Sequence, residues 1–390
     1  MHHRRDGRRL GAYKDSMTAS SKNMPERRYL IDPYFDWLEK EAVPVVEDFC
    51  VDLPQVETKP WARFDIDGAV VNMKGRGDFI SIFLLDLPPG RATSPQRHLY
   101  EEIFYVLSGH GSAVVEDADG SRRDFEWGPG SLFALPLNAS YRLFNGSGKE
   151  RARIASTNNF VMMINTFRNE SFVFENPARF PEREGQSKYF NGEGELVPNH
   201  AGRHMWETNF IPDLRAFELK NQGWRGGSAQ MVFLLAEGTL HAHCSEMSAG
   251  TYKKAHRHGP DFHVFIVNGR GYSLFWHEGD KDFLRYDWHP GCVFAPTDGI
   301  FHQHFAISSE PVRYMATAFG SGRYPFSSEK RKIKLGLETS VKMGGSQIDY
   351  EDQDPRIHHL YLEELKKNGV ECQMPQFRNE SVVAEVKRRI

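Results

Sequence analysis

The sequence predicts an all-β protein made of two jelly-roll barrels in tandem, with a helix near each end of the chain. Three observations lead to this fold class. One stretch of the chain recurs about 160 residues later. Short runs rich in β-branched and aromatic residues alternate with Gly, Pro, Asn and Asp, and helical periodicity is confined to the flanks. The 390 residues suffice for two domains of ordinary size.

The internal repeat is direct and nearly free of gaps. LPPGRATSPQRHLYEEIFYVLSGHG, at 87–111, aligns without a gap with MSAGTYKKAHRHGPDFHVFIVNGRG, at 247–271, an offset of 160 residues. WGPGSLFALP, at 127–136, and WHPGCVFAPT, at 288–297, then align at an offset of 161. Two copies of one β module that differ by a single-residue insertion would give this pattern.

The repeat and the composition divide the chain into five segments. We expect a flexible arm at residues 1–25, an N-terminal barrel with a leading helix at 26–170 and a polar linker at 171–205. A C-terminal barrel is expected at 206–325, and an extension with a helix at 326–390. The leading helix is expected at 32–43, because Asp32 can cap it and Pro33 fits its first position. The last helix is expected at 354–370, between an Asp-Pro and an Asn-Gly pair.

Composition limits the partners and the compartment. The formal net charge of −3 gives no reason to expect nucleic acid as a partner, and no apolar run approaches the roughly 18 residues of a membrane span. The four cysteines have no C-x-x-C spacing, which favours a reducing cytosol over a disulfide scaffold. We therefore expect a cytoplasmic protein with a small-molecule partner, no nucleic-acid or membrane partner, and a homodimeric assembly through its sheet edges.

Histidines in the second copy predict a metal site. In AHRHGPDFHVF, residues 255–265, His256 and His258 are two apart, so a strand would place both on one face. The repeat selects His302 as third ligand, because it lies eleven residues after Gly291, as Tyr141 lies eleven after Gly130. Imidazoles are common ligands of divalent transition metals.

Two further histidines accompany this set. His304 follows His302 by two residues and should share its face, beside the metal or a substrate, where it could act as the catalytic residue. His263 aligns with Ile103, and Phe262 takes the place of Glu102, so a regular strand would turn His263 away from the interior. A bulge after Gly259 could turn it inward, and His263 therefore stays open as a fourth ligand or a supporting residue.

Both copies resemble the cupin motifs, and the whole chain resembles a bicupin. The first copy carries this pattern as Gly90, Gln96, His98, Glu102, Gly109, Gly130, Pro136, Asn138, Tyr141 and Asn145. Gln96 and Tyr141 stand where the motif has histidines, so the resemblance implies a degenerate metal site in the first barrel. The second copy keeps the histidines, and the resemblance implies that His256, His258 and His302 bind the metal there.

The second copy is similar to the gentisate and salicylate dioxygenase branch of bicupins, because HRH is followed by an apolar residue in the glutamate position and FHQHFA comes later. This resemblance implies Fe(II), with Zn, Ni or Mn as other candidates, and O2-dependent cleavage or oxidation of a phenolic or enolisable substrate that His304 contacts. Three features depart from the branch. The intact site is in the second barrel, Val264 stands where the branch has a substrate-binding arginine, and Ala306 replaces the motif asparagine.

The substrate pocket and the reaction leave alternatives open. His243 aligns with Phe83, a barrel position, and could line the pocket with Phe262 and Trp276. A redox-neutral isomerase, lyase or decarboxylase would use the metal as a Lewis acid and would work without oxygen. A non-catalytic bicupin that binds a small molecule would hold no metal.

Overall fold

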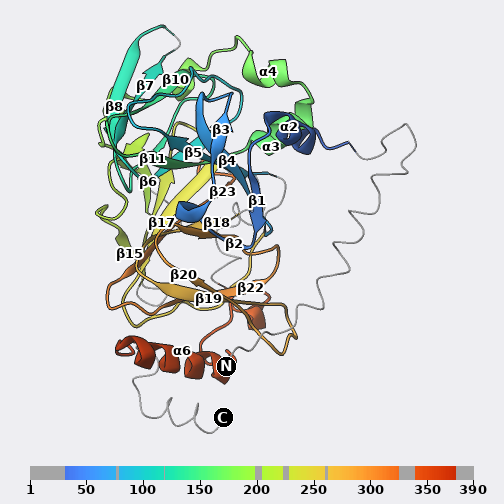
Figure 1. The fold of residues 1–390 in the computed structure, drawn as a ribbon. Coiled ribbons are helices and arrows are strands. Elements are labelled where there is room, and N and C mark those ends of the chain that lie inside the picture. Colours follow the sequence, from blue (N-terminus) through green and yellow to red (C-terminus); the bar gives the residue numbers. More distant parts are fainter. Residues whose placement is uncertain are drawn as a thin grey trace, which may run out of the picture.

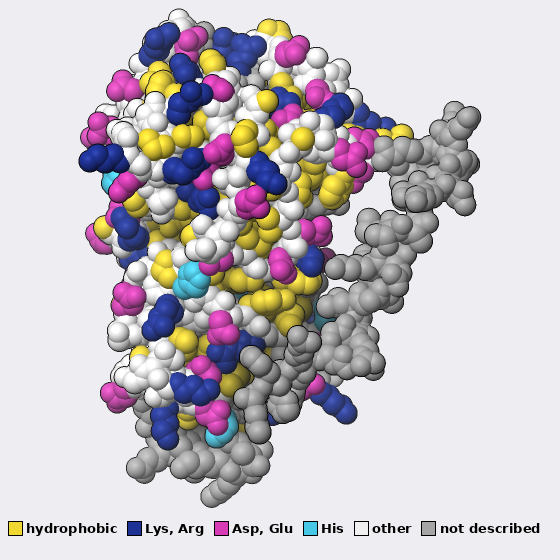
Figure 2. All heavy atoms as spheres, in the orientation of Figure 1, with side chains coloured by type: hydrophobic (Ala, Val, Ile, Leu, Met, Phe, Trp, Pro, Cys, Tyr) yellow, Lys and Arg dark blue, Asp and Glu magenta, His cyan; other side chains and the backbone are white. Residues whose placement is uncertain are grey.

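The computed structural model describes residues 31–75, 79–117, 119–197, 204–222, 228–259, 262–324 and 339–374. Two β-barrels are stacked along the long axis of the molecule, with the N-terminal barrel at the top of Figure 1 and the C-terminal barrel below it. The predicted arm at 1–25 lies outside the described residues. Basic and acidic side chains are interspersed over the face drawn in Figure 2.

The N-terminal barrel consists of two sheets. Its strands are β1 (Val45–Asp48), β3 (Lys59–Trp61), β4 (Ile66–Met73), β5 (Ser81–Leu87), β6 (Glu102–Ser108), β7 (Gly111–Glu116), β8 (Arg122–Trp127), β9 (Leu132–Ala134), β10 (Ser140–Asn145), β11 (Ala152–Asn158) and a late addition, β14 (Phe210–Ile211). The large sheet has the order β1-β4-β5-β11-β6-β9-β14, with β3 on β4, and the small sheet has the order β10-β7-β8.

The C-terminal barrel repeats this plan. Its strands are β12 (Glu195–Val197), β13 (Met205–Glu207), β15 (Lys220–Gln222), β16 (Ser228–Leu234), β17 (Leu240–Met247), β18 (His263–Asn268), β19 (Gly271–Trp276), β20 (Leu284–Trp288), β21 (Cys292–Phe294), β22 (Phe301–Ala306), β23 (Val312–Phe319) and an early addition, β2 (Cys50–Asp52). The large sheet has the order β12-β13-β16-β17-β23-β18-β21-β2, with β15 on β16, and the small sheet has the order β20-β19-β22. Two sheets per half, related by the sequence repeat, confirm the predicted pair of jelly-roll barrels.

The two halves exchange one short strand each. β2 comes from the N-terminal half and pairs with β21 of the C-terminal barrel, Asp52 opposite Cys292. β14 comes from the C-terminal half and pairs with β9 of the N-terminal barrel, Phe210 opposite Phe133. Because each barrel is completed by a strand from the other half, the halves are interlocked rather than merely adjacent.

A shared core holds the large sheets of the two barrels together. One buried apolar cluster joins both halves and includes Ile82, Leu84 and Ile103 together with Ala242, Cys244 and Phe265. The hydroxyls of Thr157 and Thr317, which have equivalent positions on β11 and β23, lie 3.2 Å apart. Each large sheet therefore turns one face to its own barrel interior and the other to the partner barrel.

Helices cover the outer ends of the barrels. α2 (Pro33–Glu41) begins at the capping Asp32, and α6 (Pro355–Asn368) runs from the capping Asp354 to Gly369, which confirms the two predicted helices. The sequence interpretation missed α3 (Phe160–Phe167), whose apolar run resembles a buried strand. The segment expected as a linker contains α4 (Glu170–Phe174), the 3-10 turns η2 (Pro181–Arg183) and η3 (Ser187–Phe190), and β12.

Two further 3-10 turns complete the described elements, η1 (Leu53–Gln55) after β2 and η5 (Val341–Met343) before α6. None of the helices in the described ranges combines the length and the apolar character that crossing a bilayer requires.

Candidate metal centre

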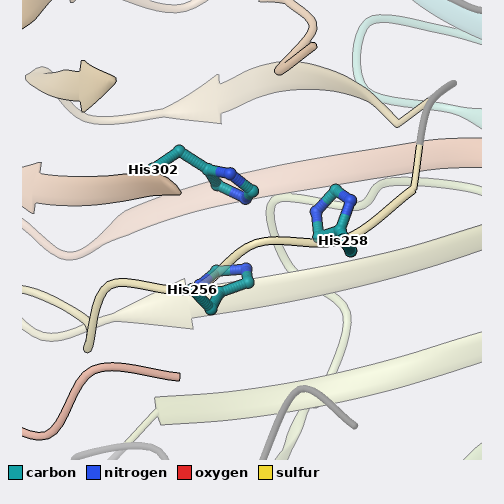
Figure 3. A group of neighbouring side chains, drawn as sticks. All are labelled: His256, His258 and His302. Carbon is teal, nitrogen blue, oxygen red and sulfur yellow. The ribbon is translucent and has the colours of Figure 1, made fainter. Parts of the chain in front are cut away.

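Three histidines converge inside the C-terminal barrel. His302 lies on β22, and His256 lies on the segment beside it, joined to it by two backbone hydrogen bonds of 2.9 and 3.0 Å. His258 follows two residues later, so its side chain returns to the same face. The three rings turn toward a common space (Figure 3), and one ligand nitrogen of each lies within 4.8 Å of the others.

Backbone carbonyls orient all three rings. The Nδ1 atoms of His256, His258 and His302 lie 3.3, 2.8 and 3.1 Å from the carbonyl oxygens of residues 254, 259 and 300, respectively. A carbonyl can only accept, so each Nδ1 is the protonated nitrogen of a neutral ring and each Nε2 keeps its lone pair. This outer arrangement is the usual one for metal-bound histidine, and three imidazole donors suit a divalent transition metal.

The position of the missing acidic ligand is apolar. Phe262 precedes β18, and its ring centroid lies 4.3 Å from that of His258. Phe275 on β19 lies against His302 from another side, with centroids 6.3 Å apart. Among the residues that the structure describes, the three-histidine group contains no carboxylate.

His304 lies on the same strand as His302, with ring centroids 5.5 Å apart. Its Nδ1 is 2.8 Å from the hydroxyl of Ser273, and that hydroxyl accepts a 2.9 Å bond from Nε1 of Trp288. Because the indole can only donate, the Ser273 hydrogen is available for His304 Nδ1, and the His304 proton is then carried by Nε2. His304 is buried.

A buried lysine and tyrosine lie next to His304. Lys253 is 3% exposed, and its Nζ donates a 2.7 Å hydrogen bond to the hydroxyl of Tyr314. The ring of Tyr314, on β23, lies 5.7 Å from that of His304. Lysine is rarely buried to this degree in a protein interior without a specific role. Neither residue, nor Ser273, was predicted from the sequence. The corresponding residues of the N-terminal barrel are Thr93 and Ala113 by the sequence repeat, and Ile154 by the strand pairing, so the difference between the two halves held the signal.

The structure brings two of the three expected pocket residues together. His243 on β17 lies 6.5 Å from Phe262 and 6.3 Å from Tyr314, measured between ring centroids, and its Nδ1 is 2.8 Å from Nε2 of His241. Trp276 lies elsewhere. It belongs to the core between the small sheet and α6, where it stacks on Phe301, because β19 turns alternate side chains to opposite faces.

His263 also lies away from the three histidines. It is fully buried on β18 opposite Thr317, the residue that contacts Thr157 of the N-terminal barrel. Residues paired across antiparallel strands share a face, so His263 faces the interface between the barrels. The pairing with β23 is regular from His263 to Ile266. The bulge considered after Gly259 would fall on residues 260 and 261, which lie outside the described residues.

The equivalent place in the N-terminal barrel is filled by a network without a metal set. Glu102 accepts hydrogen bonds of 2.6 Å from the Tyr141 hydroxyl and 2.7 Å from Ser156, and lies 2.9 Å from Nε2 of His98. Burial, and then the nearby Glu102 charge, raise the pKa of Tyr141 well above its ordinary value, which keeps the phenol protonated and a poor ligand. The Gln96 amide donates to the carbonyl of residue 63 instead.

Comparisons with known proteins give weak similarities. No protein-family model matches the chain. The auxin-binding protein T92 of Nicotiana tabacum is 30% identical over 80 residues, which are 19% of this chain and 43% of that protein. The chain thus spans less than half the length of this curated relative.

Solved structures of oxalate decarboxylase from Bacillus subtilis are also similar. One, a study of its Mn(II) centres, is 12% identical and covers 70% of this chain and 78% of its own, with a TM-score of 0.45. A second, at pH 4.6, is 12% identical with a TM-score of 0.44 over 70% of this chain and 77% of its own.

The chain itself folds as two jelly-roll barrels in tandem, as its topology and its internal repeat show.

Proposed function

We propose that the C-terminal barrel is a metal-dependent enzyme site that performs redox-neutral chemistry on a small anionic molecule. Isomerisation, elimination and decarboxylation are the reactions of this class. The observation that carries the proposal is the orientation of His256, His258 and His302, whose Nδ1 atoms all contact carbonyls so that the Nε2 lone pairs stay available.

The donor set suits iron, nickel or zinc, and manganese binds such sites more weakly. When bound, a divalent metal supplies Lewis-acid polarisation of a substrate oxygen. Three neutral imidazoles leave the metal charge uncompensated, which favours an anionic substrate.

The residues around the histidines support proton transfer. Lys253 adds a hydrogen-bond donor and a cationic group on one side of His304, held in place by the Tyr314 hydroxyl. His304, oriented by Ser273 and Trp288, presents Nε2–H as a hydrogen-bond donor to a substrate oxygen. The ammonium group of Lys253 is the group that can give up a proton and take it back. Such a pair would position a carboxylate or an enolate and exchange one proton with it, without any need for O2.

One observation favours a second candidate, O2-dependent oxidation of a phenolic or enolisable substrate. Phe262 replaces the acidic ligand, so three protein ligands leave neighbouring metal positions open. A non-haem Fe(II) oxygenase needs such positions for substrate and O2.

Metal analysis followed by assays with and without oxygen would test the proposal. The full chain is purified anaerobically beside a His256→Ala/His302→Ala variant, and both are analysed for bound metals. We expect stoichiometric metal in the wild type, loss of the site's equivalent in the variant, and turnover of hydroxy, keto or dicarboxylic acids under argon. Turnover only in air would favour the second candidate. A wild-type protein that binds no metal at this site would contradict both candidates and favour a non-catalytic function in small-molecule binding.

A further inference from the structure

A second cluster of metal-ligating side chains lies at the seam where β2 is added to the C-terminal barrel. Asp52 on β2, His289 in the turn before β21, and Cys292 on β21 each place one ligand atom within 4.8 Å of the others. The Cys50 thiol, also on β2, forms a hydrogen bond with Cys292. These residues come from two segments more than 200 positions apart, and none belongs to the three-histidine centre.

The orientation of His289 matches that of the other candidate ligands. Its Nδ1 is 3.0 Å from the carbonyl of Pro290, so Nδ1 is the donor and Nε2 keeps the lone pair. That Nε2 lies 3.2 Å from Oδ2 of Asp52. A lone pair and a carboxylate oxygen repel at this distance, so a proton or a metal cation must lie between them.

Asp52 gives a second, independent indication. Its Oδ1 is buried and has no hydrogen-bond partner among the residues that the structure describes. A buried carboxylate oxygen without a partner is costly and calls for a specific explanation. A cation bound to this carboxylate would satisfy it.

The equivalent seam of the N-terminal barrel shows that the fold does not need these residues. The repeat relates Cys50, Asp52, His289 and Cys292 to Phe210, Pro212, Gly128 and Ser131, respectively. That seam closes with a hydrogen bond of 2.7 Å from the Ser131 hydroxyl to the Pro212 carbonyl. All four ligand-type side chains are therefore confined to one of two equivalent seams.

We infer that this seam is a second metal site, which binds Zn²⁺ through Asp52, His289 and Cys292, with a solvent molecule as the fourth ligand. Thiolate, imidazole and carboxylate are the ligands that zinc takes in tetrahedral sites. The ion would fasten the exchanged strand β2 to β21. His289 is exposed and Cys292 is buried, so one side of the site opens to solvent and admits the ion.

Cobalt substitution distinguishes this site from the three-histidine centre. The full chain is stripped of metal with a chelator under reducing conditions, in the His256→Ala/His302→Ala background, and titrated with Co²⁺. Only a sulfur ligand gives a thiolate-to-cobalt charge-transfer band, and the three-histidine centre contains no sulfur. We expect this band, its loss on addition of Zn²⁺, and its loss in Cys292→Ser.

Two further variants control for folding and for thiols in general. His289→Ala changes an exposed side chain and should weaken cobalt binding more than about tenfold while the protein stays folded. Cys372→Ser removes a cysteine outside the cluster and should leave the band unchanged. A folded protein that gives no band at saturating Co²⁺, or a band that survives in Cys292→Ser, would overturn the site.

Discussion

The two barrels share one backbone plan and differ in what fills them. The N-terminal interior is packed with aromatic rings, among them Trp37, Phe83 and Phe160, which form one large apolar cluster. The interior of the C-terminal barrel holds polar groups at corresponding places. The N-terminal barrel has Thr93, Leu143, Ile154, Ala113 and Phe83 at the places of Lys253, His304, Tyr314, Ser273 and His243, respectively.

This difference separates the requirements of the fold from those of the site. The N-terminal barrel demonstrates that the scaffold closes with apolar residues at these positions, which is the cheaper solution because a buried polar group must be compensated. Polar residues concentrated in one barrel are therefore evidence of function. The polar network around Glu102 in the N-terminal interior satisfies itself with Tyr141, Ser156 and His98.

Giving the C-terminal barrel the residues of the first should have the largest effect. The variant His256→Gln/His302→Tyr copies Gln96 and Tyr141 and removes two of three ligands. We expect metal affinity at this centre to fall by more than about a hundredfold and activity to disappear, while circular dichroism stays that of the wild type. Metal binding that persists at the centre would mean that other residues hold the ion.

The reverse exchange tests whether the scaffold of the first barrel can still bind metal. Gln96→His/Tyr141→His would add two imidazoles to His98, whose Nδ1 already lies 2.9 Å from the carbonyl of Tyr100, and to Glu102. We expect one additional equivalent of bound metal by elemental analysis. Without metal the variant should lose about 1–3 kcal/mol of stability, because Glu102 loses the Tyr141 hydrogen bond. An unchanged metal content in a folded variant would show that two added histidines are not sufficient to restore metal binding in the N-terminal barrel.

Replacement of Lys253 should have a smaller effect on activity, and its neighbour Lys254 provides the control. Lys253→Met keeps the volume and removes the charge inside the barrel, so we expect kcat/KM for an anionic substrate to fall about tenfold to a hundredfold, or about 1.4–2.8 kcal/mol. Lys254→Met is the matched control, because Lys254 pairs with Asp349 outside the barrel. Equal effects of the two variants would contradict a role of Lys253 in substrate binding.

The sequence could predict the repeat, the barrels and the two capped helices because each depends on local signals. Gly90, Gly130 and their counterparts Gly250 and Gly291 have positive φ, which only glycine adopts readily. Their spacing therefore survives in both copies and defines the register. The same register selected His302, which the structure places with His256 and His258.

The strand exchange could not be predicted, because β2 and β14 are three and two residues long and their pairing depends on the distant halves. α3 was missed because its helical conformation follows from packing against α2 and the barrel, where Phe160 lies 4.4 Å from the ring of Trp37 on α2 and 5.9 Å from that of Phe83 on β5. Lys253 was not predicted either. Its burial follows from an irregular bridge segment that alternation does not describe.

The helices that cover the two barrels differ in their response to acid. We expect this difference to have the smallest of the predicted effects on stability. α2 and α3 cover the N-terminal barrel with aromatic packing, whereas α6 places His358 on the C-terminal barrel, with its Nδ1 3.1 Å from the hydroxyl of Tyr252. Burial, and then the neighbouring His359, lower the pKa of His358 to about 4. Since the unfolded state takes up this proton near pH 6.5 and the folded state does so only near pH 4, stability is lost as the pH falls between these values.

We expect this histidine to reduce the free energy of unfolding by about 1–3 kcal/mol between pH 6.5 and pH 4. Urea unfolding followed across this range, with tryptophan fluorescence as the signal, measures the slope. In His358→Gln, which stays neutral at the same place, the contribution of this residue to the slope should vanish. If the free energy of unfolding depends on pH in the same way in the variant, the acid response of the C-terminal barrel does not arise from His358 on α6. The helices that cover the two barrels would then not differ in this respect.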